Sequence, residues 1–516
     1  MQNNYYLRSN TITTKGVLLF SLVILGSCKV SAPIQMPAPV NLPLSFLETK
    51  QQVRTDTLLS DGLLIDTLKG ERAISEAVSA DSSNIGYIPK NDFFADTYLV
   101  RLIEIGLQNN FDRLQALQRI EIARAQVQTR RGALLPTVNV IAQAGVDKFG
   151  DYTMNGVGNY DTNLSDNLSG NQQIPNPTPD YFLGVRSSWE IDIWGKLANQ
   201  RKGAYMRLLA SERGKQFIET ALVAQVAGLY YELLTLDYEL EIIRQNIALQ
   251  QTAVELVEVQ KSAGRVTQLA VQQFKAQLLN TKSLQAGVGQ EIIVAENRLN
   301  ALLGRFPQQV QRGKPILEQI LPSTIQAGVP SAMLHRRPDI LQAELELAAT
   351  RADVDAARAS FFPSLTISTY VGLNAFNASL LFNPASLAYG ILGGLSTPFL
   401  NRRQLAAAYN YSAARTMEAY YNYQQTIIRG FSEVVTSLQG IENYGKALTF
   451  KGSQVEELRQ AASTANDLFV AGYATYLEVV TAQRNVLEAE LELADVKKEQ
   501  FLSLIDLYRA LGGGWE

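Results

Sequence analysis

The sequence has little of what catalytic, disulfide-linked and nucleic-acid-binding proteins use. Its 516 residues include one cysteine and one histidine, so no disulfide can form within one molecule. His335 follows a leucine and precedes two arginines in a turn before a helical pattern, where a structural or solvent-facing role is expected. There is no P-loop and no G-x-S-x-G motif, and the net charge of −3 gives no sign of polyanion binding. We therefore expect a non-enzymatic protein with no cofactor and no bound metal.

The chain also lacks any run of about 18 apolar residues, the length of a membrane-spanning helix. Its clearest apolar run, GVLLFSLVILG at 16–26, follows Arg8 and Lys15 and has the length of a signal-peptide core. The run leads into LGSC, which resembles the lipobox of bacterial lipoproteins and ends at Cys28. A plain signal peptide with an incidental cysteine is the alternative. We predict that residues 1–27 are removed and that Cys28 is acylated, which also excludes it as a nucleophile.

The residues after the cysteine are rich in proline. Four prolines fall between Pro33 and Pro43, where missing amide donors and fixed φ angles oppose both a helix and a central strand. We predict that residues 28–92 form an extended, lipid-anchored segment lying over the rest of the protein.

Two halves of the chain repeat the same phrases in the same order. RGALLPTVNV begins at Arg131 and RASFFPSLTI at Arg358, whereas AGRVTQLAV begins at Ala263 and AGYATYLEV at Ala471. Each half closes in a related phrase, LNALLG or LYRALG. Three landmarks in one order indicate an internal duplication of about 200 residues. The predicted domains are two repeats, 93–304 and 331–516, and a linker, 305–330.

The first shared phrase predicts a change from helix to strand. Pro136 and Pro363 stand where a helix must stop, because proline has no amide proton to donate. Alternation with a period of two then predicts strands at 137–146, 183–193, 364–373 and 389–397. Each has about the 9–11 residues that a tilted strand needs to cross a bilayer.

An ordinary sheet in a soluble α+β protein is the alternative to a membrane sheet. Export, lipidation and the small number of strands favour the membrane. A spanning sheet must close on itself, and bacterial barrels begin at eight strands. Four strands therefore need partner chains, and two chains would give eight strands, three twelve.

Very long helical patterns make up most of each repeat. The stretches 196–262 and 402–470 contain no proline, and at about 1.5 Å per residue each could reach roughly 100 Å. A 3,4 spacing of apolar residues from Leu477 to Tyr508 predicts a coiled-coil seam. The second stretch also contains four glycines that imply either close helix neighbours or local kinks: Gly430, Gly440, Gly445 and Gly452.

The second shared phrase predicts helical hairpin tips. Gly264 and Gly472 are suited to the positive φ of a helix C-terminus, and Thr267 and Thr475 to capping the next helix. These tips should lie far from the strands.

The polar composition of the segment 147–180 predicts a long solvated loop. Its N-x-D-x-N pattern at Asn159, Asp161 and Asn163 resembles part of a calcium loop. Leu164 and Gly170, however, occupy positions where an EF-hand loop requires glycine and glutamate. We therefore prefer a loop without metal.

The lipobox, the doubled LP and FP phrases, and the stretch from Leu334 to Leu365 with its RPDI and FPSL motifs resemble the TolC-like outer-membrane factor family, in its lipoprotein branch. The resemblance covers residues 92–515. It implies an α+β membrane protein in which three chains build one twelve-stranded β-barrel in the outer membrane, and their helices a coiled-coil tunnel through the periplasm.

The family resemblance also implies a function: an outer-membrane efflux channel that receives drugs, metals or other small molecules from an inner-membrane pump through a periplasmic adaptor. It places Gly264, Val266, Thr267, Gly472, Ala474 and Thr475 at adaptor-facing tips. It places Glu478 at the channel entrance, where an exposed helix charge is the alternative, whereas a second frequently acidic position holds Thr481. A protein-secretion channel and a periplasmic lipoprotein scaffold are the other candidate functions.

Overall fold

The fold is described from a computed structural model, which covers residues 36–39, 41–43, 45–46, 85–322, 325–398 and 400–515. Cys28 and the predicted signal peptide lie outside these residues. The chain divides into two compact units. The strand unit comprises 122–208 and 345–420 with the described residues up to Pro37; the helical unit comprises 38–121, 209–344 and 421–516, again in its described part.

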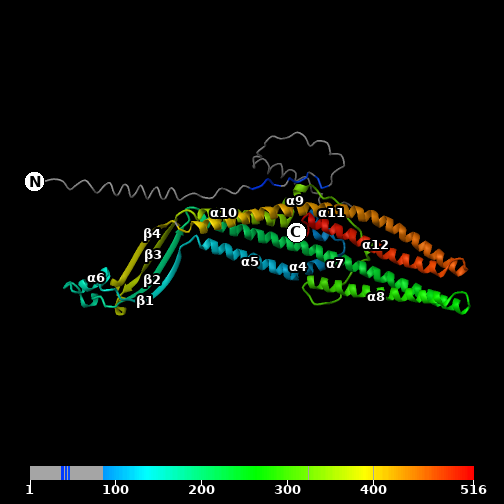
Figure 1. Cartoon of the computed structure of the whole chain (residues 1–516), viewed down its shortest axis with the longest axis horizontal. Helices are drawn as coiled ribbons and strands as arrows, with labels where there is room; N and C mark the ends of the chain where they lie inside the picture. Colours follow the sequence, from blue (N-terminus) through cyan, green and yellow to red (C-terminus); the bar gives the residue numbers. More distant parts are fainter. Residues whose placement is uncertain are drawn as a thin grey trace, which may run out of the picture. The chain divides into compact units, whose positions relative to one another are not determined.

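The strand unit contains one antiparallel sheet in the order β1-β2-β3-β4 (Figure 1). Its strands are β1 (Thr137–Asp147), β2 (Thr178–Ile191), β3 (Ser364–Ala375) and β4 (Leu387–Ser396). All four lie where the alternation predicts strands, but β2 was predicted at 183–193 and is misplaced at both ends. It starts earlier because its ladder with β1 continues until Thr178 faces Asp147. It stops earlier because the Asp192 carboxylate turns to accept the amides of Leu197 and Ala198 at the start of the next helix.

The segment between β1 and β2 is more ordered than a solvated loop. It contains the helix α6 (Met154–Asn163) and the 3-10 turn η2 (Gly170–Gln172). Thr153 caps α6, since its hydroxyl accepts the Gly156 amide at 3.2 Å. The shorter connection between β3 and β4 contains two 3-10 turns, η4 (Ala378–Leu380) and η5 (Pro384–Ser386).

Four helices have segments in both units: α5 (Phe111–Gly132), α7 (Lys196–Ser262), α10 (Pro338–Ala359) and α11 (Arg402–Ala471). The bounds of α7 agree with the prediction, and α11 is one residue longer than predicted. By its length and composition, one stretch of α7 could cross a membrane, but 56% of that stretch is buried inside the protein. Such burial is that of a core helix.

The remaining helices belong to the helical unit: η1 (Ile85–Tyr87), α3 (Lys90–Phe93), α4 (Thr97–Asn109), α8 (Gln268–Leu302), η3 (Ile316–Glu318), α9 (Pro330–Arg336) and α12 (Tyr476–Ala510). Within this unit α7 with α8, and α11 with α12, form two long hairpins whose tips lie at the same end (Figure 1).

The main core of the helical unit joins short and long helices. Its fully buried side chains include Leu99 of α4, Tyr230 of α7, Leu299 of α8, Ile340 of α10 and Leu507 of α12. A second cluster lies near the hairpin tips and takes residues from both hairpins, among them Val257, Phe274, Phe469 and Val479. Burial of this apolar surface holds the two hairpins together at that end.

Candidate functional site

The two helix-to-strand junctions are built alike. Pro136 stands between the end of α5 and the first residue of β1, and Pro363 stands between the end of α10 and the first residue of β3. At each junction a tryptophan indole donates to a backbone carbonyl: Trp189 to Leu134 at 3.0 Å and Trp194 to Pro363 at 2.7 Å. Both prolines therefore lie where the sequence predicts the change from helix to strand.

The two tryptophans were not singled out from the sequence. Trp194 also stacks on Phe362, with ring centroids 4.8 Å apart and planes inclined by 21°. Both indoles remain partly exposed, at 36% for Trp189 and 49% for Trp194. Partly exposed aromatic residues with one polar atom gather at the two edges of membrane proteins. Their place at the strand ends, next to the repeated prolines, is the signal that could have identified them.

One face of the sheet is apolar on all four strands. The strand register aligns Val140, Val185, Val371 and Tyr389 in one row across the sheet. The next row in one direction reads Ala142, Leu183, Leu373 and Leu387. Val140 is 80% exposed and Tyr389 76%, so within the described chain this face is bare.

The opposite face is mostly polar or small, with the rings of Phe182 and Tyr370 among the polar residues. One row reads Asn139, Arg186, Tyr370 and Gly390, and another begins with Gln143, Phe182 and Asn374. Apolar residues on one face and polar residues on the other, over strands of 10–14 residues, are the pattern of a membrane-spanning barrel.

Aromatic rings cover glycines on the polar face. A Cβ at Gly184 or Gly372 would lie 2.9 Å from the end of the Phe182 ring, and a Cβ at Gly390 would lie 2.5 Å from the Tyr370 ring. The two rings meet edge to face, with centroids 6.2 Å apart. The glycines are needed here because any side chain would displace these rings.

The sheet does not close within one chain. In its described part, β1 pairs only with β2, and β4 pairs only with β3. Each outer strand therefore presents a row of backbone donors and acceptors that need partners inside a membrane.

The hairpin tips have the backbone that the sequence predicts. Gly264 has φ +73° and Gly472 has φ +83°, and at both positions the φ favours glycine. At the first tip the Arg265 amide bonds to the Gln260 carbonyl, and at the second the Tyr473 amide bonds to the Leu468 carbonyl. Both bonds close the end of the preceding helix.

The two tips differ in how the following helix begins. The Thr267 hydroxyl accepts the Ala270 amide at 3.4 Å. At the second tip, the amide and hydroxyl of Thr475 both donate to one carboxylate oxygen of Glu478, at 2.5 Å and 2.9 Å. These hydrogen bonds lower the pKa of the Glu478 carboxyl from its ordinary value. Glu478 thus serves as the acidic partner of a capping box, a role that the sequence reasoning did not consider.

The other predicted tip residues lie less exposed. Val266 and Ala474 are half-buried and pack against the cluster near the tips, whereas Tyr473 is 86% and Leu477 56% exposed. The most exposed apolar side chains of the second tip therefore flank the predicted residues.

The RPDI motif forms a buried ionic cluster in the helical unit. The Arg337 side chain is 3% exposed, and its guanidinium donates to both carboxylate oxygens of Asp339, at 3.0 Å and 2.7 Å. It also donates to Glu433 of α11 at 2.9 Å and to the Ala510 carbonyl at the end of α12 at 3.1 Å. One side chain thus ties α10, α11 and α12 together.

The calcium-like pattern does not form a site. Asn159, Asp161 and Asn163 lie on α6, where residues two apart point to different sides of the helix. Among the described residues, no group of three or more His, Cys, Asp or Glu side chains could hold a metal ion. His335 lies in the last turn of α9.

Known proteins share this arrangement. The chain matches the family model described as "Outer membrane efflux protein" at residues 102–305 and 329–513. It is 28% identical to the solvent efflux pump outer membrane protein SrpC of Pseudomonas putida over 505 residues, which cover 97% of this chain and 98% of that protein. It is also 28% identical to the probable outer membrane lipoprotein SilC of Salmonella typhimurium over 425 residues, 82% of this chain and 87% of that protein.

A solved structure agrees with the sequence comparisons. The cation efflux system protein CusC of Escherichia coli K12 is 28% identical over 422 residues, 82% of this chain and 88% of that protein. A CusC crystal structure matches with a TM-score of 0.73 at 26% identity, covering 83% of this chain and 95% of that chain. Long helices, four antiparallel strands and the matched family model, which spans more than half of the chain, lead to one conclusion: this protein belongs to the outer membrane efflux protein family and has the TolC-like fold.

Proposed function

We propose that this protein is the outer-membrane exit duct of a tripartite efflux pump. The observation that carries the proposal is the sheet with one bare apolar face and two unpaired outer strands. A lipid bilayer would cover the apolar face, and neighbouring copies would pair the outer strands. The family consists of channels, so the energy for export must come from a partner.

Three copies are the assembly we propose. Four strands per chain cannot reach the eight of the smallest bacterial barrels, and three chains give twelve. The polar face, with Asn139 and Arg186, would then line a water-filled passage. The exposed apolar residues of the long helices, such as Leu279 of α8 and Phe450 of α11, would be covered by neighbouring copies along the tunnel.

Lipidation at Cys28 is supported by the contacts of the nearest described residues. The Met36 sulfur accepts from the Arg351 guanidinium at 3.0 Å, and the Tyr420 hydroxyl donates to the Pro37 carbonyl at 2.7 Å. Met36 follows Cys28 by eight positions, so the two are at most about 28 Å apart along the chain. Arg351 lies eight residues before the end of α10, a helical rise of about 12 Å, and β3 begins five residues beyond that end. An acyl chain on Cys28 is therefore within reach of the membrane edge.

The tips are the proposed docking site for a periplasmic adaptor. Gly264, Val266 and Thr267 at the first tip, and Gly472, Ala474 and Thr475 at the second, shape the backbone, and Tyr473 and Leu477 offer exposed apolar surface. Apolar and aromatic side chains of this kind are common at the centres of protein interfaces. We propose that the adaptor connects these tips to the inner-membrane pump.

Glu478 is proposed as the charge at the channel entrance. It is exposed, and its lowered pKa keeps it ionised at physiological pH. Three copies would favour cations over anions there. Its capping-box bonds are compatible with this role, because the second carboxylate oxygen takes no part in them.

The substrates of the relatives are solvents, for SrpC, and cations, for CusC. We propose a small-molecule substrate for this protein as well, in preference to a secreted protein. A strain lacking the gene should become sensitive to at least one class among drugs, solvents and metal ions, and the complementing gene should restore resistance. Unchanged survival on the whole panel, together with loss of a secreted protein, would favour the secretion channel.

The assembly has its own test. Outer-membrane fractions should contain a trimer that survives detergent and dissociates on heating. A monomer released by high salt would contradict the barrel and favour a periplasmic scaffold.

A further inference from the structure

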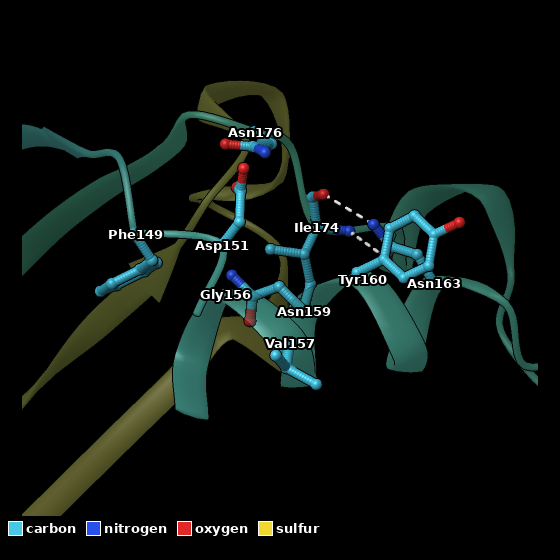
Figure 2. Close-up of a pocket in the computed structure, with 9 residues that line it drawn as sticks. All are labelled: Phe149, Asp151, Gly156, Val157, Asn159, Tyr160, Asn163, Ile174 and Asn176. Carbon is cyan, nitrogen blue, oxygen red and sulfur yellow. Dashed lines mark hydrogen bonds between the residues drawn. The ribbon is translucent and has the colours of Figure 1, made fainter. Parts of the chain in front are cut away.

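The segment between β1 and β2 encloses a cavity that the channel function does not use. Its volume is about 330 Å³, at the lower end of ligand pockets. Its walls come from the turn after β1, from α6, and from the residues that lead back into β2 (Figure 2). It lies at the end of the sheet away from the proline junctions, because β1 runs from Pro136 toward it.

Local contacts hold the walls of this cavity in place. A Cβ at Gly156 would lie 2.1 Å from the Gly150 carbonyl oxygen, so the glycine lets the turn pack directly on α6. On the other side, the Asn163 amide donates to the Ile174 carbonyl at 2.9 Å and accepts the Ile174 amide at 2.8 Å. This reciprocal pair fastens the returning chain to α6. The cavity is therefore formed before any ligand arrives.

The lining combines aromatic rings with planar polar groups. Phe149 and Tyr160 stand on opposite sides, with the side chains of Asp151, Asn159 and Asn176 between them (Figure 2). The Asn176 amide forms no hydrogen bond within the described residues, and Asn159 has a single contact, to the Thr178 hydroxyl at 3.4 Å. These two amides are free to bind a ligand, whereas Asp151 accepts from Lys148 through Oδ1 at 3.3 Å and keeps Oδ2 for a ligand.

The side chains that line the cavity favour one class of ligand. Amides offer donors and acceptors side by side, and a carboxylate accepts strongly from hydroxyls, so the set matches a ring that bears several hydroxyl groups. The aromatic faces suit the apolar C–H face of such a ring. No lysine or arginine lines the cavity, and Lys148 beside it is already paired with Asp151, which disfavours phosphates and acidic sugars. A single carboxylate, that of Asp151, is too little for a metal ion.

We propose that this cavity binds a neutral hexose unit, either as a free sugar or as part of a cell-surface glycan. The aromatic rings stack on the sugar, and Asp151, Asn159 and Asn176 bind its hydroxyls. This site would be separate from the export path.

Saturation-transfer NMR on the purified full-length protein tests the proposal. The detergent must carry no sugar headgroup, because a maltoside would occupy the cavity. The probes are glucose, galactose, mannose, N-acetylglucosamine and glucose 6-phosphate, and a neutral oligosaccharide released from lipopolysaccharide. At least one neutral probe should bind, and glucose 6-phosphate should bind more weakly than glucose. Binding of the free hexoses identifies a small-sugar site, and binding of the oligosaccharide alone identifies a glycan site.

Matched variants assign the binding to the cavity. Tyr160→Ala and Asn159→Ala should each weaken the affinity about tenfold or more, the effect of losing about 1.4 kcal/mol of binding. Tyr152→Ala and Asn155→Ala are the controls, because both residues are exposed neighbours that do not line the cavity, and they should bind as the wild type does. Channel conductance in a planar bilayer should be unchanged in all four variants, which shows that each is folded.

The proposal is wrong if no neutral probe binds the wild type at millimolar concentration, if only the phosphate binds, or if the four variants bind equally. None of these results bears on the channel function, which the conductance measurement reports separately.

Discussion

At the scale of single residues, Arg337 shows how a sequence motif translates into stability. Its guanidinium is buried and bonds to Asp339, Glu433 and the Ala510 carbonyl, and these carboxylates raise its pKa even though burial itself lowers it. Removing one partner of a buried ionic cluster leaves the other charges uncompensated.

We predict that Arg337→Met destabilises the protein by up to about 3 kcal/mol, because the largely buried Asp339 would lose its cation, whereas Glu433 is partly exposed and keeps Arg509 at 3.6 Å. Thermal or denaturant unfolding of the purified protein measures the effect. Arg415→Met is the matched control: Arg415 pairs with Glu418 on an exposed helix face, and its loss should cost less than about 1 kcal/mol. Equal losses in the two variants would contradict a special role for the buried cluster.

The capping-box role of Glu478 and its proposed role at the channel entrance can be separated by substitution. Glutamine can still accept the Thr475 bonds of the capping box but carries no charge, whereas alanine removes both. We predict that both variants reduce the cation selectivity of the channel, and that Glu478→Gln lowers the melting temperature less than Glu478→Ala does, because a neutral amide accepts the two bonds more weakly than the carboxylate. Single-channel recording and thermal unfolding measure the two quantities. If selectivity and conductance are unchanged in Glu478→Gln, the residue is a helix cap alone.

At the scale of elements, the sequence predicts the helices and strands well because their patterns are long and uninterrupted. The 67 residues of α7 contain no proline, and its bounds agree with the prediction. The end of β2 was misplaced because a carboxylate, Asp192, ends the strand in order to cap α7, and alternation carries no information on such a competition. Helix α6 was missed because asparagine and glycine favour turns, and its cap at Thr153 is a short local signal.

Three of the four glycines of α11 agree with one of the two explanations left open by the sequence, a close helix neighbour. A Cβ at Gly440 would lie 2.7 Å from the Ser503 hydroxyl, and one at Gly430 would lie 3.0 Å from the Arg337 guanidinium. Gly445 similarly approaches Gln500, at 3.1 Å. These three allow a close neighbour, whereas within the described residues nothing lies within 4 Å of a Cβ at Gly452. Sequence alone could not separate them, because glycine has the same helix propensity at every position.

A carboxylate between three helices makes the stability of the helical unit depend on pH. Burial, and then the neighbouring Asp495, raise the pKa of Glu239 from 4.5 to about 7, while Lys498 opposes the rise and Glu291 adds to it. The folded state holds the Glu239 proton more tightly than the unfolded state does. The contribution of Glu239 to the free energy of unfolding is therefore greatest at acidic pH and falls as the pH rises from 4.5 to about 7.

We predict that Glu239→Gln stabilises the protein by about 1–2 kcal/mol at pH 8 and has little effect at pH 4.5, the magnitude being reduced because the carboxyl is partly solvated. Thermal unfolding across this pH range measures the difference. Glu241→Gln is the control, because Glu241 is exposed on the same helix, and it should leave the pH dependence as it is in the wild type. A pH profile unchanged by Glu239→Gln would disprove the assignment.

At the scale of the whole molecule, the sheet is the part for which we propose contacts with other copies. Ile391 and Gly394 lie on opposite faces of β4. Ile391 pairs with Thr369 on the apolar face, and Gly394 pairs with Thr366 on the polar face. The number of chains could not be derived from one sequence, because two and three chains both satisfy the strand arithmetic.

We predict that Ile391→Arg abolishes the heat-sensitive trimer, because an arginine facing the bilayer midplane costs about 2–4 kcal/mol in each chain. Gly394→Arg should preserve the trimer and reduce cation conductance, since a Cβ at Gly394 meets nothing within 4 Å and the side chain would enter the passage. Gel mobility before and after heating, followed by bilayer recording, gives both results. The opposite behaviour of the two variants would mean that the faces of the sheet are assigned the wrong way round.

The capping difference between the two tips has a consequence for symmetry. The two repeats give each chain two tips of nearly the same backbone, with φ +73° and +83° at their glycines, so three chains would present six similar tips in a ring. Only the second tip carries a carboxylate at its cap, Glu478, where the first carries Ala270. The ring would thus have nearly sixfold symmetry in shape but threefold symmetry in charge. A partner that recognises the shape of a tip would find six equivalent binding sites, whereas a partner that recognises the carboxylate would find three.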